Sequence, residues 1–265
     1  MTEKRVINAL DSDVPLPYQE LNEKIRKAIQ DGEKHIVIKN CLGQRFIGAG
    51  IKETVKIDIE GIPGNDLGMF MDGPEIEVYG NAQDQTGNTM NSGKIVIHGN
   101  AWDVTGLSMR GGNVFVKGDG GYRIGIHMKE YQDKIPTLIY GGKVKEFFGE
   151  YMGGGILAVL GLKIDNGEVE NIPSNELIGG LLGSGIHGGK IYIRGDVDKR
   201  MLGIGAGIQE FDKDDEKVLK PIFKEFAEHF NIPESMIWER EITKVIPASH
   251  RPFAAYYCKG NICIE

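Results

Sequence analysis

Short segments in which apolar and polar residues alternate recur along the middle of the chain. The apolar pairs are Ile57 and Ile59, Ile76 and Val78, Ile95 and Ile97, Val114 and Val116, Leu157 and Val159, and Ile191 and Ile193. A period of two indicates β-strands that direct one face inward. The residues beside them include Lys94, His98, Lys117, Lys190 and Arg194. We therefore expect the other face of each strand to be polar and to meet solvent or a partner.

The alternating segments recur at an interval of 19 residues. Three columns of residues share this interval: Gly61, Gly80, Gly99 and Gly118; Gly68, Gly87, Gly106 and Gly125; and Met71, Met90, Met109 and Met128. The unit returns as Gly142, Gly149, Met152 and Gly161 after an insertion of five residues, which we place within residues 129–136. A second insertion, of fifteen residues, falls within residues 163–176, before the last unit ends at Gly195.

A coil of 19 residues has room for about three short strands, and stacked coils pair each strand with its counterpart about 4.8 Å away. We therefore predict an all-β fold, a parallel β-helix of about seven 19-residue coils over residues 42–195. Glycine accounts for 38 of 265 residues, which suits corners with positive φ and close packing between coils. A left-handed hexapeptide helix would need an 18-residue coil, and an antiparallel sandwich or barrel would need no fixed columns.

Two flanking regions complete the expected domain plan of an N-terminal cap (1–41), the β-helix (42–195) and a C-terminal extension and tail (196–265). Residues 17–31 predict a helix that ends near Gly32 and precedes a strand at 35–39. Its apolar face contains Leu21, Ile25, Ala28 and Ile29. Residues 214–230 predict a second helix with the apolar stripe Val218, Ile222, Phe223, Phe226 and Phe230. We expect the helices to cap the open ends of the β-helix; a docking role for the second helix is the alternative.

Charge and composition narrow the class of function. The chain has 31 Lys and Arg against 38 Asp and Glu, a formal net charge of -7, which does not favour nucleic-acid binding. The longest apolar stretch, residues 153–162, is about half of the roughly 20 residues that a transmembrane helix needs. The N-terminus lacks the apolar segment of a signal peptide. We expect a cytoplasmic protein that does not bind a membrane.

Paired acids and a glycine-rich segment imitate catalytic and phosphate-binding motifs. Asp84 and Asp103 occupy the same place in successive coils, so stacking brings them about 5 Å apart, as in retaining glycosidases. Turn capping within a repeat column is the simpler interpretation. The segment Gly118-Asp-Gly-Gly121 followed by Gly125 resembles a phosphate loop, but its glycines follow the repeat columns and no βαβ unit surrounds it.

Histidines and cysteines offer two further candidate sites. His127 and His187 lie in comparable regions of two units, with Arg123, Lys129 and Glu130 near the former, so the alternatives are a polar pocket and a turn or subunit contact. The three cysteines, Cys41, Cys258 and Cys263, disfavour a disulfide framework. The last two leave open a metal site, a terminal disulfide and free thiols. We assign no catalytic, cofactor-binding or metal-binding residue.

Several repeat segments closely resemble the GXGXG family. They are residues 80–84, 87–90, 106–112, 121–131 and 149–155, and the similarity extends to residues 61–66, 184–189 and 244–252. The family comprises the C-terminal domain of the glutamate synthase large subunit, its stand-alone counterparts and a subunit of formylmethanofuran dehydrogenase. The resemblance implies a single-stranded right-handed β-helix without an active centre of its own.

In glutamate synthase, a domain with an N-terminal cysteine nucleophile hydrolyses glutamine, and a domain with FMN and an iron–sulfur cluster transfers the ammonia to 2-oxoglutarate. Cys41 lies far from the start and no three-cysteine cluster is present, so the resemblance implies a non-catalytic subunit that links a glutaminase (amidotransferase) subunit to an FMN-containing synthase subunit. We expect the two insertions to contact these partners. The alternatives are a scaffold subunit of a formylmethanofuran dehydrogenase-like redox complex and a carbohydrate-active β-helix enzyme. A homo-oligomer is also left open.

Overall fold

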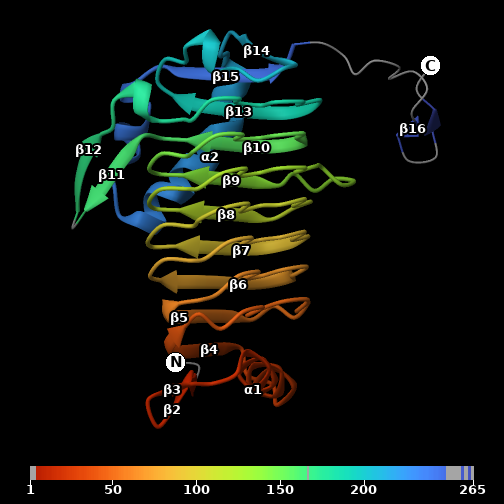
Figure 1. The fold of residues 1–265 in the computed structure, drawn as a ribbon, viewed down its shortest axis with the longest axis vertical. Helices are drawn as coiled ribbons and strands as arrows, with labels where there is room; N and C mark the ends of the chain where they lie inside the picture. Colours follow the sequence, from red (N-terminus) through yellow and green to blue (C-terminus); the bar gives the residue numbers. More distant parts are fainter. Residues whose placement is uncertain (1–3, 166, 249–257, 260–261, 264–265) are drawn as a thin grey trace.

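One long sheet runs the length of the molecule (Figure 1). The computed structural model describes residues 4–165, 167–248, 258–259 and 262–263. In spatial order, the strands of the sheet are β1 (Arg5–Asn8), β4 (His35–Leu42), β5 (Lys56–Ile62), β6 (Asp72–Tyr79), β7 (Ser92–Ile97), β8 (Asn113–Val116), β9 (Thr137–Tyr140), β10 (Gly153–Val159), β13 (Gly188–Arg194), β15 (Ile242–Pro247) and β14 (Ala206–Gln209). Successive strands from β1 to β13 pair in parallel, so the fold is a parallel β-solenoid, as the repeat predicts.

The strand register reproduces the repeat. From β5 to β13 the aligned residues are Ile57, Ile76, Ile95, Val114, Leu138, Leu157 and Ile191, which define six turns. An earlier connection joins β4 to β5, where Ile36 pairs with Ile57. The turn count is thus close to the expected number of coils. The two longer steps, from Val114 to Leu138 and from Leu157 to Ile191, contain the insertions where the sequence places them.

Buried methionines fill the lumen beside the inward residues of the strands. The fully buried members of this column are Met71, Met90, Met109, Met128 and Met152. Four of the five, Met71, Met90, Met128 and Met152, place their methyl group against a glycine of the next coil; a β-carbon built on Gly112 would overlap the methyl group of Met90. Gly112 also has φ of +79°, which a residue with a side chain rarely adopts. The methionine column thus depends on a second glycine column that holds neighbouring coils close.

The N-terminal end of the lumen is covered as expected. Helix α1 (Tyr18–Gln30) buries Leu21, Ile25 and Ala28 in the same cluster as Ile7 of β1 and Ile36 of β4. Asn22 and Arg26 donate hydrogen bonds to the backbone of the first coil, at Arg45 O (2.9 Å) and Ala49 O (2.7 Å). A short hairpin, β2 (Leu10–Asp11) and β3 (Val14–Pro15), connects β1 to this helix.

The position of the second helix differs from the expectation. Helix α2 (Lys213–Phe230) lies along the outer face of the sheet and not over its far end, which β15 and β14 extend with antiparallel pairing (Figure 1). Its residues Phe223 and Phe226 pack against Phe115 of β8 and the outward residues Val96, Ile139, Ala158 and Tyr192. The helix covers this face because the outward positions of these strands are apolar, as in strands buried on both sides.

The position of α2 changes the expected exposure of two residues. Val218, which we expected in the apolar stripe, is 43% exposed, and Leu219 is buried in its place. Arg194, which we expected to face solvent or a partner, is only 1% exposed. The remaining elements are the hairpin β11 (Leu162–Asp165) and β12 (Glu168–Asn171), the hairpin β16 (Cys258–Lys259) and β17 (Ile262–Cys263), and three 3₁₀ turns, Ser174–Glu176, Lys199–Met201 and Glu234–Glu239.

Candidate partner-binding site

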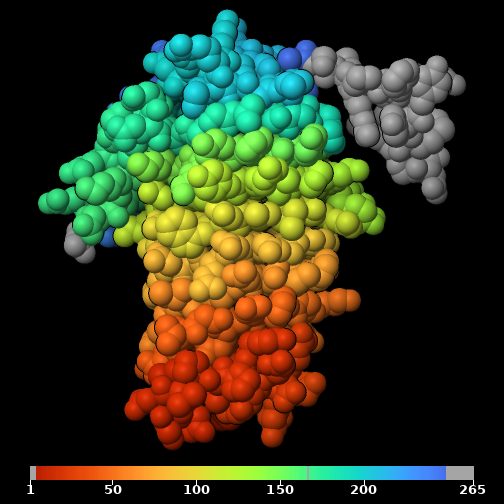
Figure 2. Space-filling model, viewed as in Figure 1, coloured from red at the N-terminus to blue at the C-terminus, as the bar shows by residue number. Residues whose placement is uncertain are grey.

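The second insertion forms an antiparallel hairpin that projects from the flank of the solenoid. Strands β11 and β12 pair Leu162 with Asn171 and Ile164 with Val169. Ile164 and Val169 pack against the apolar cluster that also holds α2, so the hairpin leans on the helix and the sheet together. In Figures 1 and 2 the hairpin, coloured green, stands out at the side where the parallel strands end. The sequence-based expectation that this segment leaves the coil is confirmed.

Two arginines fix the base of the hairpin. Arg194 donates from Nη1 to Asn171 Oδ1 (2.8 Å) and Leu160 O (3.2 Å), and its other nitrogens donate to Ile237 O (2.8 Å) and Met236 O (2.6 Å). Burial lowers the pKa of Arg194 to about 10, and the nearby Arg240 adds to this effect. The guanidinium therefore stays charged at neutral pH, and its hydrogen-bond acceptors are three backbone carbonyl oxygens and the Asn171 side chain. Arg240 donates to Ile172 O at 2.8 Å.

A groove of about 630 Å³ separates the hairpin from the solenoid. Its solenoid wall is the corner that follows the strands, and its other wall is the hairpin and the segment to Glu176. The wall residues are Asn81, His98, Gly99, Asn100, Lys117, Gly118, Asp119 and Lys143 on one side and Leu162–Asp165, Glu170–Pro173 and Glu176 on the other. A smaller hollow of about 290 Å³ beside the exposed Trp102 shares Asp119, Lys143 and Glu176 with the groove.

The corner beneath the groove is a ladder of side-chain to backbone hydrogen bonds. Asn100 N donates to Asn81 Oδ1 (2.8 Å), Asp119 N to Asn100 Oδ1 (2.8 Å), and Lys143 N to Asp119 Oδ1 (2.9 Å). Each coil thus satisfies a backbone donor of the next one, which holds this wall in place. Asn81, Asn100 and Asp119 thus stack at the same corner of successive coils.

Charges of both signs line the groove. Lys117, Lys143 and Lys163 face a similar number of acids, and the ion pair between Lys163 and Glu170 (3.3 Å) is about two-thirds exposed. Exposed pairs of this kind contribute little to stability because water and salt screen them. A mixed, polar surface beside an exposed Trp is typical of the rim of a protein–protein interface. The arrangement suits protein binding better than the binding of a polyanion.

Asp84 and Asp103 lie in register in successive coils, as expected, and both cap a turn of the next coil. Asp103 N donates to Asp84 Oδ1 (3.1 Å), and Tyr122 N donates to Asp103 Oδ1 (2.9 Å). A β-carbon on Gly121 would overlap Asp103 Oδ1, so this glycine serves the same ladder. The contacts favour turn capping over a glycosidase pair, and they explain the glycines of residues 118–121 without a phosphate.

The residues around His127 form contacts between coils. The His127 ring stacks on Tyr151, with centroids 5.4 Å apart and an angle of 13°. Arg123 pairs with the buried Glu150 and lies over the ring of Phe147 at 4.5 Å. The His187 ring and the Lys129 side chain both lie beside Gly153. Glu130 Oε1 accepts a hydrogen bond from Gly155 N (2.9 Å). These interactions fit the turn interpretation better than a shared pocket.

The first insertion makes a smaller projection. Tyr131 and Lys134 form an isolated bridge, and Lys134 Nζ reaches Asp72 Oδ1 at 3.2 Å. Arg110 lies over the Tyr131 ring at 5.9 Å, and the side chains of Tyr131 and Ile135 are exposed. This projection offers a second, less enclosed surface for a partner.

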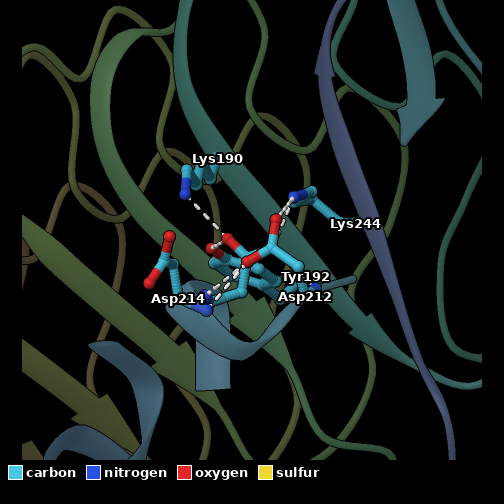
Figure 3. Close-up of polar contacts among 6 residues, drawn as sticks. Lys190, Tyr192, Asp212, Asp214 and Lys244 are labelled. Carbon is cyan, nitrogen blue, oxygen red and sulfur yellow. Dashed lines mark hydrogen bonds and ion pairs between the residues drawn. The ribbon is translucent and has the colours of Figure 1, made fainter. Parts of the chain in front are cut away.

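A buried polar cluster that sequence reasoning missed pins the start of α2 to the sheet (Figure 3). Asp215, fully buried, accepts hydrogen bonds from Lys190 Nζ (2.7 Å) and Tyr192 Oη (2.8 Å) and pairs with the buried Lys244. Asp212 caps the helix through Asp214 N (2.9 Å) and Asp215 N (3.0 Å). In Figure 3, Lys190 and Lys244 approach from two different strands. Only the acidic start of the helix was visible in the sequence.

The charges of this cluster stabilise one another. Although burial opposes ionisation, hydrogen bonds from Lys190, Lys244 and Tyr192 hold the pKa of Asp215 well below its usual range. Burial and the neighbouring Asp215 raise the pKa of Tyr192. Burial alone would lower the pKa of Lys244, but its pairs with Asp215 and Asp212 raise it. The cluster is therefore a fixed set of charges that anchors a helix.

The described part of the chain gives no set of metal ligands. Among the residues that the structure describes, no group of three or more His, Cys, Asp and Glu side chains is arranged to hold a metal ion. Burial raises the pKa of the Cys41 thiol to about 12, so this cysteine is a poor nucleophile. Residues 249–252 of the similar tail, including His250, lie outside the described residues.

No described helix has the length and apolar composition needed to cross a bilayer.

Comparison with known proteins agrees with the geometry. The family model described as the GXGXG motif matches residues 18–247, which contain α1, α2 and every strand of the long sheet except β1. The chain is 52% identical over 261 residues to the uncharacterized protein MJ1350 of Methanocaldococcus jannaschii, covering 96% of this chain and 97% of that protein. A match of this extent, on a solenoid whose glycine columns hold the coils together, shows that the chain belongs to the GXGXG family.

Proposed function

We propose that the protein is a non-catalytic structural subunit of a glutamate synthase-type complex, which converts glutamine and 2-oxoglutarate to glutamate. In this role it holds an amidotransferase subunit against a synthase subunit. FMN and the iron–sulfur cluster belong to the synthase partner, and this chain supplies surfaces. Family membership over residues 18–247 is the observation that carries the proposal, because the family occurs in glutamate synthase as the C-terminal β-helical domain that packs the two catalytic domains together.

The mechanical properties of the fold support this role. A stack of coils with one continuous core is stiff along its axis, so partners bound at separate coils keep a fixed spacing without a cost of reorganisation. Asp84 and Asp103, which the sequence offered as a candidate catalytic pair, accept hydrogen bonds from the backbone of the next coil. The flank of the solenoid therefore suits protein contact better than catalysis.

The groove beside the β11–β12 hairpin is the partner surface that we propose. Arg194 and Arg240 hold the base of the hairpin, and the Asn81–Asn100–Asp119 ladder holds the opposite wall. A preformed surface of this kind binds with little loss of conformational entropy. Its mixed charges would set the orientation of the partner rather than the overall affinity.

Co-expression tests both the function and the surface. The full chain is produced with an amidotransferase subunit and an FMN-containing synthase subunit of the same organism and purified through a tag on this chain. We expect both to co-purify. Recovery of neither would contradict the proposed function, and recovery of subunits of another redox complex would support the formylmethanofuran dehydrogenase-like alternative.

A hairpin variant then tests the surface by itself. Residues 163–170 are replaced by a two-residue Gly-Asn turn, which leaves Leu162 and Asn171 in place. We expect the melting temperature of the solenoid to change little and the affinity for at least one partner to fall about tenfold or more. A charge reversal in the groove, Lys143→Glu, should also weaken partner binding. Its charge-matched control is Lys24→Glu on α1, at an exposed ion pair with Glu20. Undiminished binding by the hairpin variant would contradict the surface but leave the function intact.

A further inference from the structure

One edge of strand β11 faces the groove without a paired strand. In the described part of the chain, β11 belongs to a two-stranded sheet whose other member is β12. All of its residues, Leu162–Asp165, line the groove, whereas β12 contributes Glu170 and Asn171. In Figure 1, β11 lies between β12 and the solenoid. The edge of β11 that turns away from β12 therefore lies open to the groove.

The backbone of β11 shows which groups point from this edge. Leu162 N donates to Gly141 O of the solenoid at 2.7 Å, so the Leu162 backbone faces away from β12. Successive residues of a strand direct their N–H and C=O groups to opposite sides, so Ile164 faces the same way as Leu162. Among the residues that the structure describes, the opposite wall offers the Ile164 N–H and C=O no backbone partner. This donor and this acceptor point into the groove.

The side chains of β11 alternate between a polar and an apolar face. Lys163 and Asp165 are exposed, and Ile164 packs against the apolar layer that holds α2. Across the hairpin, Lys163 pairs with Glu170 at 3.3 Å, but Asp165 lies opposite another acid, Glu168. Like charges directly opposite each other destabilise a pair of strands. A cation on the open side of β11 would offset this repulsion.

We propose that an extended segment of a partner subunit adds to β11 as a third strand of the hairpin. Its backbone exchanges hydrogen bonds with Ile164, an apolar residue of the segment lies beside Ile164, and a Lys or Arg lies beside Asp165. This inference rests on the proposed function, which assigns the groove to a partner, and it adds the form and chemistry of the bound segment. In strand addition, main-chain hydrogen bonds supply affinity and alternate side chains supply specificity.

An extended segment suits this edge better than a helix does. A helix satisfies its own backbone groups, so it would cover the Ile164 N–H and C=O and leave them without partners, which is unfavourable. An added strand pairs with both groups. It also turns a two-stranded hairpin, which is marginal by itself, into a three-stranded sheet with one apolar face.

Two proline variants of the full chain test the strand addition. Ile164→Pro removes the N–H that faces the groove. Val169→Pro is the matched control, because Val169 lies opposite Ile164, packs on the same apolar layer and has its backbone on the other edge of the hairpin. Neither N–H takes part in the pairing of β11 with β12, and proline is tolerated at strand edges.

Affinities are measured with the amidotransferase and FMN-containing synthase subunits of the same organism, and melting temperatures show that both variants are folded. Ile164→Pro should weaken the binding of one subunit at least about tenfold, and Val169→Pro should change it by less than about twofold. Ile164→Val, which keeps the N–H, should bind as the unmodified chain does. Equal affinities of the two proline variants would overturn the inference.

A charge reversal tests the cation that we place beside Asp165. Asp165→Lys should weaken binding about threefold or more. Glu23→Lys, at an exposed position of α1, is the charge-matched control and should leave the affinity unchanged. Equal effects of the two reversals would contradict the chemistry assigned to the segment.

Amide exchange in the unmodified chain gives an independent measurement. Hydrogen–deuterium exchange, resolved to single residues, is compared with and without the bound subunit. The Ile164 amide should exchange at least about tenfold more slowly in the complex, and the Val169 amide should be unaffected. A complex in which the Ile164 amide is not protected would overturn the inference and leave the proposed function standing. Failure of both subunits to bind the unmodified chain would contradict the proposed function and the inference with it.

Discussion

Single side chains in this protein act across coils more than within them. Asn81, Asn100 and Asp119 each accept a hydrogen bond from the backbone 19 or more residues later, and four of the five column methionines pack against a glycine of the following coil. Such residues tolerate replacement poorly because every coil presents the same small space to its neighbour. Asp215 likewise acts between elements that lie apart in the sequence, because its charged partners come from β13 and β15.

Removing the carboxylate of Asp215 should destabilise the fold strongly. Asp215→Ala leaves Lys244 buried without its closest counter-charge, and breaking a buried pair in this way costs about 3–5 kcal/mol. The measurement is urea-induced unfolding of both proteins at neutral pH. Glu20→Gln, at an exposed ion pair on α1, is the matched control and should change stability by less than about 0.5 kcal/mol. Equal effects of the two substitutions would contradict the anchoring role of Asp215.

Lowering the pH should decrease the free energy of unfolding, because some carboxyl groups have a lowered pKa in the folded protein. Although burial opposes ionisation, hydrogen bonds from His98 and Lys56 lower the pKa of Glu77 to about 2, and the pKa of Asp215 is also held low. A carboxyl with a lower pKa in the folded state stabilises the fold above its unfolded pKa, and this stability is lost as pH falls through the folded pKa.

For Glu77 this window runs from about pH 4.5 down to about pH 2. We expect the free energy of unfolding to decrease over this range, with a contribution from Glu77 on the order of 3 kcal/mol. Glu77→Gln should have a flatter pH profile in denaturant titrations. A profile with the same slope as that of the unmodified protein would show that this carboxyl is not the source.

At the scale of elements, the outer face of the sheet decides where α2 lies. Phe223 and Phe226 pack against the outward residues of β7 to β13, and the β11–β12 hairpin adds Ile164 and Val169 to the same cluster. Helix and hairpin thus share one apolar layer. The groove exists because that layer holds the hairpin away from the corner of the coils.

Truncation of a central α2 side chain should loosen the helix more than the coils. Phe226 is fully buried and meets Phe115 and Phe230 edge to face. Phe226→Ala should cost about 3–5 kcal/mol, and hydrogen exchange within Lys213–Phe230 should accelerate more than exchange in β5. Val218→Ala on the exposed side of the helix is the control, with an expected change within about 0.5 kcal/mol. Uniform acceleration over the whole chain would argue against a separate helix layer.

At the scale of the whole molecule, each coil contacts chiefly the coils before and after it. Stability in such a stack is a sum of coil and interface terms, so interior coils have two stabilising neighbours and terminal ones have a single neighbour. The sheet order from β1 through β13 to β14 places the interior at β6 to β9. Helix α1 covers one end of this stack, and β15 and β14 extend the sheet at the other end. These terminal elements have a stabilising neighbour on one side.

Native-state hydrogen exchange should follow this order. We expect the strand amides of β6 to β9 to exchange at least about tenfold more slowly than those of β1 and β14. Mass spectrometry of peptides from partly exchanged protein measures this difference. Slower exchange at β1 than at β7 would contradict the nearest-neighbour description of the solenoid.

The sequence by itself determined the stack of coils. The glycine and methionine columns, the stacked column of Ile57, Ile76 and Ile95, and both insertion points appear in the structure where the repeat places them. These features follow from the sequence because a coil packs on its neighbour at a fixed interval, so the same local requirement recurs and is visible as a period. The turn role of Asp84 and Asp103 followed for the same reason.

Only the tertiary structure decided what covers the outside of the stack. The burial of Arg194, the placement of α2 on the flank, and the union of Lys190, Asp215 and Lys244 join segments that lie far apart in the chain. Each of these contacts occurs once, so no period reveals it, and an apolar helix stripe fits an end or a face of the solenoid equally well. The physical reason is that helix packing depends on which complementary apolar surface lies within reach, and distance in space is not encoded by local sequence pattern.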